Sequence, residues 1–410
     1  MNLRYAIVWM SGLAVLSDAV LIAFYPQFFE QRYGVTSSFH VGAYVAAISL
    51  AVMCTLPLWA RIAKRTETMR LLQYTQAGAG CLCVLSYWAD TVNLYWLLTL
   101  LMFMCKSSYL LMFPYLLRHE HPDTHSNTVG LLSVIVHLGA IAGAIIGGWV
   151  MQHWGPAFCL WIMAAGDFAQ WLICWKLRSS GKLPITEPPA SAGSVVPVPS
   201  TSIVNRVLIL CLVLLIFDFS AHLISPFFTV YWEQVSGIGS QVITGLVFAI
   251  PGLMALLALL ANKLSPARLK RRFEHLQTNL LLGAVGLAMQ AVPQVWVMVL
   301  GRAVFGWALF QAIVSLEVSV FRFSTPSAYA LDYSRANFFQ NLGVLLASFA
   351  AGALVAQWGI QISFVIGAAG LLLTAAVERT WLGIDQVDHP PPQNHASSIP
   401  STTGTPSHVS

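Results

Sequence analysis

Long apolar segments recur along nearly the whole chain, and they constrain the fold more than any other feature of the sequence. Each is close to the ~20 residues that an α-helix needs to cross a bilayer. Because lipid offers the backbone no hydrogen-bond partners, helices satisfy their own polar groups there. We therefore predict an all-α, multi-pass membrane protein with twelve spans, at residues 5–25, 39–60, 70–89, 93–117, 127–151, 156–177, 203–228, 239–261, 276–293, 294–316, 333–357 and 361–384.

The composition argues against a soluble enzyme. Only 9% of the residues are charged, against roughly 25% in an average soluble domain. The sequence has no phosphate-binding glycine loop, nucleophile elbow or zinc-binding helix motif, so we expect no enzyme activity, no cofactor and no metal. The seven cysteines lie within or at the ends of predicted spans, and their odd number favours packing over a disulfide framework.

The basic residues are unevenly distributed, which predicts the topology. Of 21 Lys and Arg residues, only Arg32 lies in a loop on one side of the predicted bundle, while Lys106 and Arg302 lie within spans. The others fall on the opposite side, which the positive-inside rule places in the cytoplasm with both termini. The formal net charge of +5 is thus explained by topology, and we expect no nucleic-acid partner. The predicted location is the inner or plasma membrane.

Two stretches about two hundred residues apart repeat each other. Each begins with an acid inside a span and reaches a proline eight residues later, as Asp18 to Pro26 and as Asp218 to Pro226. A second repeated pattern has an offset of 204: Gly139, Gly148 and Trp154-Gly155 recur as Gly343, Gly352 and Trp358-Gly359. These repeats predict two related six-helix halves, and transporters built from such halves bind substrate at the interface between them.

The repeats also define the domains. We expect an N-terminal half at 1–178, a cytoplasmic linker rich in Pro, Ser and Gly at 179–202, and a C-terminal half at 203–384. Residues 385–410 are predicted to be a disordered cytoplasmic tail.

The fifth span contains regularly spaced glycines: Gly130, Gly139, Gly143, Gly147 and Gly148. This pattern resembles the proton-antiporter motif of the major facilitator superfamily, with Ala144 where those antiporters usually have proline, and the resemblance covers residues 1–384. It implies two six-helix halves, alternating access, and a central cavity lined by the first, fourth, seventh and tenth helices. Glycines at four-residue spacing permit close helix approach. Gly139, Gly143, Gly147 and Gly148 are therefore expected to let this span move against its neighbour in the other half.

The loop after the second span resembles the family pattern less closely. Its basic residues are present as Arg61, Lys64 and Arg65, and the resemblance implies a role in gating. Ala60 replaces the acid of the family pattern, and Leu56 and Ala63 replace its two glycines. A latch that depends on that acid must be built differently here.

Acids inside the spans are candidates for proton coupling, because intramembrane charges mark pathways by default. Asp18 and Asp218 lie on two of the helices that the resemblance assigns to the cavity. His222 is one turn after Asp218 on the same helix face, and histidine titrates near neutral pH. The alternative is a structural role, as a fixed ion pair or a hydrogen-bonded histidine. For Asp167, in the sixth span, we expect a structural bond to a neighbouring helix or loop.

The cations inside the spans are candidates for substrate binding. Lys106 and Arg302 lie on the fourth and tenth spans, and His137 lies beside the glycines of the fifth. Together with the two acids, these cations favour a zwitterionic or anionic substrate.

The resemblance implies a secondary transporter of a small organic molecule. We expect a monomer whose partners are substrate, protons and membrane lipid. The glycine pattern favours proton-coupled export. Proton-coupled uptake uses the same moving parts and stays open as an alternative, as does a receptor or scaffold that kept the fold and lost transport.

Overall fold

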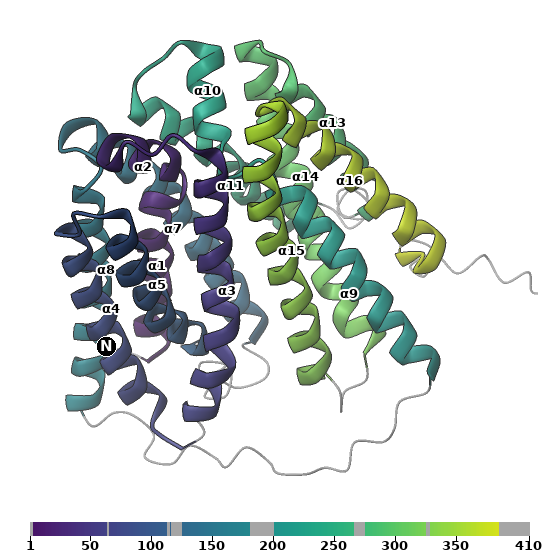
Figure 1. Ribbon diagram of the computed structural model, residues 1–410. Helices are drawn as coiled ribbons and strands as arrows, with labels where there is room; N and C mark the ends of the chain where they lie inside the picture. The colour runs from purple at the N-terminus through teal and green to yellow at the C-terminus, as the bar shows by residue number, and fades with distance from the viewer. Residues whose placement is uncertain are drawn as a thin grey trace, which may run out of the picture.

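The computed structural model describes residues 3–63, 65–112, 115, 125–180, 201–265, 275–324 and 329–384, and these form a bundle of long helices (Figure 1). The N-terminal half consists of α1 (Leu3–Ile22), α3 (Ser38–Ala63), α4 (Thr68–Tyr87), α5 (Val92–Lys106) with the 3₁₀ turn η1 (Ser107–Leu111), α7 (His125–His153) and α8 (Phe158–Ser179). The C-terminal half consists of α9 (Thr201–His222), α11 (Gln241–Leu264), α13 (Leu276–Ala291), α14 (Val295–Phe323), α15 (Tyr329–Trp358) and α16 (Gln361–Trp381).

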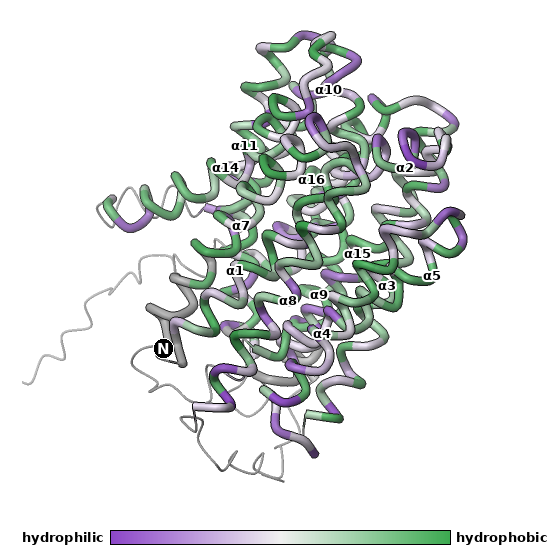
Figure 2. Tube along the Cα trace, turned by 90° about the vertical axis from the view of Figure 1, so that its left-hand side faces the viewer, coloured by the Kyte–Doolittle hydropathy of each residue, from purple (hydrophilic) through white to green (hydrophobic). Residues whose placement is uncertain are grey.

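Within the described residues, nine helices are long and apolar enough to cross a membrane. With α4, α9 and α13 they occupy the twelve predicted spans in order, which confirms the predicted fold class. Hydrophilic residues gather toward the ends of the bundle, while its sides are largely hydrophobic (Figure 2). Exposed apolar side chains within the helices, such as Leu101, Leu257 and Val285, belong to these sides, as expected for surfaces in contact with lipid.

The two Asp-to-Pro segments fold alike. After α1 the chain turns into a short helix, α2 (Tyr25–Tyr33), and after α9 it turns into another, α10 (Phe228–Ser236). Both short helices end at a glycine with φ of +66°, Gly34 and Gly237. This left-handed conformation closes helix C-termini and favours glycine. The sequence repeat therefore corresponds to a repeated structure.

The halves meet through two helix pairs, α3 with α15 and α7 with α11. Gly42 and Gly352 bring α3 and α15 into backbone contact, since a Cβ on Gly42 would lie 2.7 Å from the Cα of Gly352. Gly245 of α11 packs in the same way on the main-chain oxygen of Ala144 in α7. Glycines permit this approach because they carry no side chain.

Polar contacts between the halves lie on the side of α2 and α10. Thr229 donates to the main-chain oxygen of Ala23 (2.7 Å), and Gln27 donates to Glu233 (3.2 Å). Ser240 donates to Gln152 at the same end (2.9 Å). The hydrogen bonds from Gln27, Thr229, Ser240 and Val242 across the halves all lie on this side, and the helices splay apart at the opposite end (Figure 1). The bundle is thus closed at one end.

Residues 181–200 of the predicted linker and the predicted tail at 385–410 lie outside the described residues, as does Lys64.

Candidate functional site

Lys106 is the centre of a buried ionic cluster in the N-terminal half. It is the last residue of α5, and its side chain is 1% exposed. Its Nζ lies 2.7 Å from Asp18 Oδ1 of α1 and 3.2 Å from Asp167 Oδ1 of α8. It also donates to the Ser17 hydroxyl at 2.9 Å. One ammonium group therefore connects three helices.

The cluster contains one more acid than we expected. Asp167 is fully buried, and its partner is the same cation that pairs with Asp18. Its presence inside a span was the available indication, but the resemblance did not assign the sixth span to the cavity, and we expected only a structural bond for Asp167. Two carboxyls face one ammonium, so the buried charge is balanced when one carboxyl holds a proton. Asp18, 27% exposed, is the member of the cluster that reaches solvent.

Ser17 completes the cluster and fixes its orientation. Its hydroxyl accepts from Lys106 and donates to the main-chain oxygen of Met163 in α8 at 3.0 Å. Gly166 lets α8 approach α1 here, because a Cβ at that position would lie 2.9 Å from the Cβ of Ser17. The close helix contact holds Asp18 and Asp167 on either side of the lysine.

Asp218 occupies the related position in the C-terminal half, but its surroundings differ. The residue is 6% exposed, and its Oδ1 lies 3.8 Å from Nδ1 of His222. That nitrogen donates to the main-chain oxygen of Asp218 at 2.9 Å. The other carboxyl oxygen, Oδ2, is buried without a hydrogen-bond partner. In the described part of the chain, Asp218 forms no ion pair with lysine or arginine.

Arg302 does not fill that gap, although it lies on the tenth span, which the resemblance assigns to the same cavity as the span of Asp218. Its guanidinium stacks on the ring of Phe228, 3.5 Å from the centroid. It donates to the main-chain oxygens of Phe248 (3.0 Å) and Val247 (3.4 Å) in α11. Pro251 explains this arrangement: it has no N–H for the carbonyl four residues before it, which is that of Val247.

Gly306, four residues after Arg302, packs against the same proline. A Cβ there would clash with the Cα of Pro251, so only glycine lets α14 lie this close to α11. The Arg-x-x-x-Gly element of the tenth helix thus docks α14 on a proline-containing segment of α11. This contact differs from the substrate-binding position predicted for Arg302.

His137 and the glycines of α7 lie at helix contacts. The His137 ring is 5.7 Å from the ring of Phe310 in the other half. Gly139, Gly143 and Gly147 share one helix face and pack on the α1 backbone, whereas Gly148 packs on Gln241 of α11. Only Gly148 therefore faces the other half, because it lies about 100° around the helix from Gly147. The expected contact with the opposite half is wrong for the other three.

Arg61 and Arg65, predicted to act in gating, are exposed at the end of α3 and just beyond it. Among the described residues, no ion pair joins either of them to the ionic cluster, and their role in gating stays a prediction.

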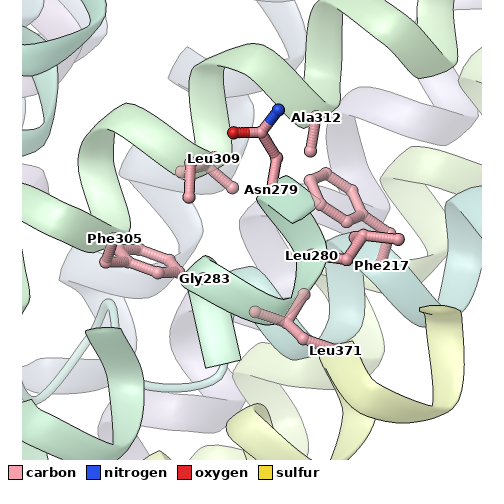
Figure 3. Close-up of a pocket in the computed structure, with 9 residues that line it drawn as sticks. Phe217, Asn279, Leu280, Gly283, Phe305, Leu309, Ala312 and Leu371 are labelled. Atoms are coloured by element: carbon pink, nitrogen blue, oxygen red, sulfur yellow. The ribbon is translucent and has the colours of Figure 1, made fainter. Parts of the chain in front are cut away.

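A small crevice lies among α9, α13, α14 and α16, and its lining is apolar except for Asn279 (Figure 3). Phe217, Leu280, Phe305 and Leu371 form much of the wall. The crevice has no room for a water molecule, so it is a packing gap and not a substrate cavity.

Comparison with known proteins adds independent information. A family model described as Major Facilitator Superfamily matches residues 7–276. The multidrug resistance protein MdtG of Salmonella schwarzengrund is 24% identical over 255 residues, covering 60% of this chain and 61% of that protein. MdtG of Salmonella choleraesuis is 23% identical over 328 residues, covering 78% and 79%. The solved structure of the POT family transporter PepTSo has a TM-score of 0.77 at 9% identity, over 94% of this chain and 98% of that one. This last likeness concerns the fold alone.

Proposed function

Because the chain belongs to the major facilitator superfamily, we propose that it exports a small organic molecule by proton-coupled alternating access. The proposal rests on the ionic cluster of Lys106, Asp18 and Asp167. A structural ion pair needs one acid for one cation, whereas this cluster has two acids. The second carboxyl is a place where a proton can be held and released inside the membrane.

The geometry supports a coupling role because the three residues belong to three helices. Protonation of either acid removes part of the attraction between Lys106 and α1 or α8. Such a change alters how these helices are held together, and a proton binding event is thereby linked to helix packing. Asp18 is the route for the proton, since it alone among the acids of the cluster is partly exposed.

Export is favoured by the curated relatives, which carry the name multidrug resistance protein. The bundle is closed on the side of α2 and α10, which the predicted topology places outside the cell, and a transporter in this state exchanges substrate with the cytoplasm. Asp218 and His222 stay predicted participants in coupling.

Proteoliposomes that contain the purified full-length chain and an internal pH indicator test the proposal. A panel of candidate solutes is added under an imposed pH gradient, and both solute flux and proton flux are recorded. We expect Asp18→Asn and Asp167→Asn to abolish gradient-driven accumulation while keeping solute exchange in the absence of a gradient. Asp90→Asn, at an exposed position, is the matched control. Unchanged gradient-driven flux in both cluster variants would refute the coupling role.

A further inference from the structure

The two buried cations of the described spans, Lys106 and Arg302, are already bound by the protein. Lys106 is held by two acids and a hydroxyl. Arg302 is held by two main-chain oxygens of α11 and the face of Phe228. Neither is available to an anion, which removes the basis for expecting an anionic or zwitterionic substrate.

Asp218 presents the opposite situation. Its carboxyl is nine-tenths buried, and Oδ2 has no hydrogen-bond partner. A buried polar atom without a partner is costly, and buried carboxylates in proteins are normally paired. His222 is the nearest group that can carry a positive charge, but its Nδ1 already donates to the main-chain oxygen of Asp218 and lies 3.8 Å from Oδ1. The position therefore lacks a permanently charged partner of the kind that Lys106 supplies to Asp18 in the N-terminal half.

The difference between the halves has a structural cause. Lys106 and Arg302 lie on the corresponding fourth and tenth helices. In the N-terminal half the cation points to the acid of the first helix. In the C-terminal half, the carbonyl of Val247 and the ring of Phe228 hold the guanidinium instead. The acid of the seventh helix is left without a cation.

Glu317 of α14 is a second acid near Asp218, and it is exposed to solvent. Its negative charge repels that of Asp218. It lies seven residues after Phe310, on the same face of α14, and Phe310 meets His137 of the other half. Glu317 thus faces the interface between the halves, where it would raise the local concentration of a cation.

We propose that Asp218, with Glu317 at its approach, binds the positively charged group of an organic cation. The charge of the bound cation pairs with Asp218 in the C-terminal half, as Lys106 pairs with Asp18 in the N-terminal half. A metal ion fits less well, since no group of three or more His, Cys, Asp or Glu side chains meets within the described residues. The inference rests on the proposed transport function and specifies its substrate class.

Tetraphenylphosphonium and tetraphenylborate test the proposal, because they share a shape and differ in the sign of their charge. Equilibrium binding of each labelled ion to the purified full-length chain is measured, with empty detergent micelles as background. We expect specific binding of the cation and none of the anion. Asp218→Asn should weaken cation binding by at least about tenfold, while Asp218→Glu retains it. Asp332→Asn is the control, since that buried acid already has Ser324 and Arg335 as partners.

Thermal melting of each variant in detergent shows whether it is folded. Specific binding of the anion, or cation binding that a folded Asp218→Asn variant retains, would overturn the proposal. Such a result would leave the transport proposal intact if Asp18 and Asp167 still govern gradient-driven flux. Conversely, binding of the cation that depends on Asp218 supports the substrate class even where proton coupling through Lys106 fails its own test.

Discussion

Arg302 donates a hydrogen bond to the main-chain carbonyl of Val247 (3.4 Å), the carbonyl that Pro251 leaves without an amide partner in α11. A proline inside a helix costs about 3 kcal/mol or more, and an unpaired backbone group in a membrane adds several kcal/mol. The guanidinium of a neighbouring helix reduces this cost. It also binds the carbonyl of Phe248, so α14 and α11 are connected at the proline.

This relationship predicts that Arg302 and Pro251 are energetically coupled. Arg302→Leu should destabilise the protein by about 2–3 kcal/mol, because it leaves buried acceptors unpaired. In a Pro251→Ala background the new N–H satisfies Val247, so the same substitution should cost about 1 kcal/mol less. Thermal melting of the four proteins in detergent measures the coupling. Additive effects of the two substitutions would contradict it.

The Lys106 cluster predicts a charge-balance effect on stability. Lys106→Met leaves the buried Asp167 and the partly exposed Asp18 without a cation and should cost about 3–5 kcal/mol. Adding Asp167→Asn removes one of those charges and should recover a large part of the loss. Melting temperatures and expression levels of the single and double variants provide the comparison. The idea is wrong if the double variant is no more stable than Lys106→Met.

Close contact between Gly42 and Gly352 predicts sensitivity to a single methyl group. Gly42→Ala would place a Cβ 2.6 Å from the main-chain oxygen of Ser348, so α3 and α15 must separate. We expect about 1–3 kcal/mol of destabilisation of the closed state. Gly78→Ala is the control, because its nearest neighbour would be 3.9 Å away. Spin-label distances across α3 and α15 should lengthen for Gly42→Ala and stay constant for the control.

The link between Gln27 and Glu233 predicts a pH dependence of the closed end. Burial raises the pKa of Glu233 above its ordinary value, an effect that the hydrogen bond from Gln27 partly opposes. When the end opens and the side chain meets water, its pKa returns toward the ordinary value. The closed state therefore binds the proton more tightly, and its stability falls as pH rises from the ordinary pKa through the raised one.

Spin labels at the exposed positions Gln31 and Gln234 report this opening, since they lie on α2 and α10. The distance between them should increase with pH in the wild type. Glu233→Gln keeps an acceptor for Gln27 but cannot titrate, and its distance should not change with pH. A pH response of equal size in Glu233→Gln would assign the effect to another group.

Much of the architecture could be predicted from sequence because the membrane imposes it locally. Each span must satisfy its own backbone hydrogen bonds, so length and hydrophobicity are sufficient to identify the helices. The repeat from Asp18 to Pro26 and from Asp218 to Pro226 predicted two related halves. The short helices that follow these segments, α2 and α10, both end at a glycine, Gly34 and Gly237.

The candidate site was predicted only in part. The sequence indicated that Lys106 and Asp18 lie on cavity helices, but it gave no means of knowing that α8 turns Asp167 toward the same ammonium group. Asp167 was therefore interpreted as a structural residue. Arg302 was predicted to bind substrate, whereas its partners are two main-chain oxygens of α11, one of which Pro251 leaves without an amide partner.

The sequence by itself determined the membrane class, the helices, the duplication and the presence of costly charges within the spans. These follow from short-range rules, in which each residue is judged by its neighbours along the chain. Only the tertiary structure decided which charges meet. That outcome depends on the rotation of each helix about its axis and on glycine contacts such as Gly166 with Ser17. These contacts join residues that are far apart along the chain. The contact of Arg302 with α11 leaves Asp218 without the cation that Asp18 has.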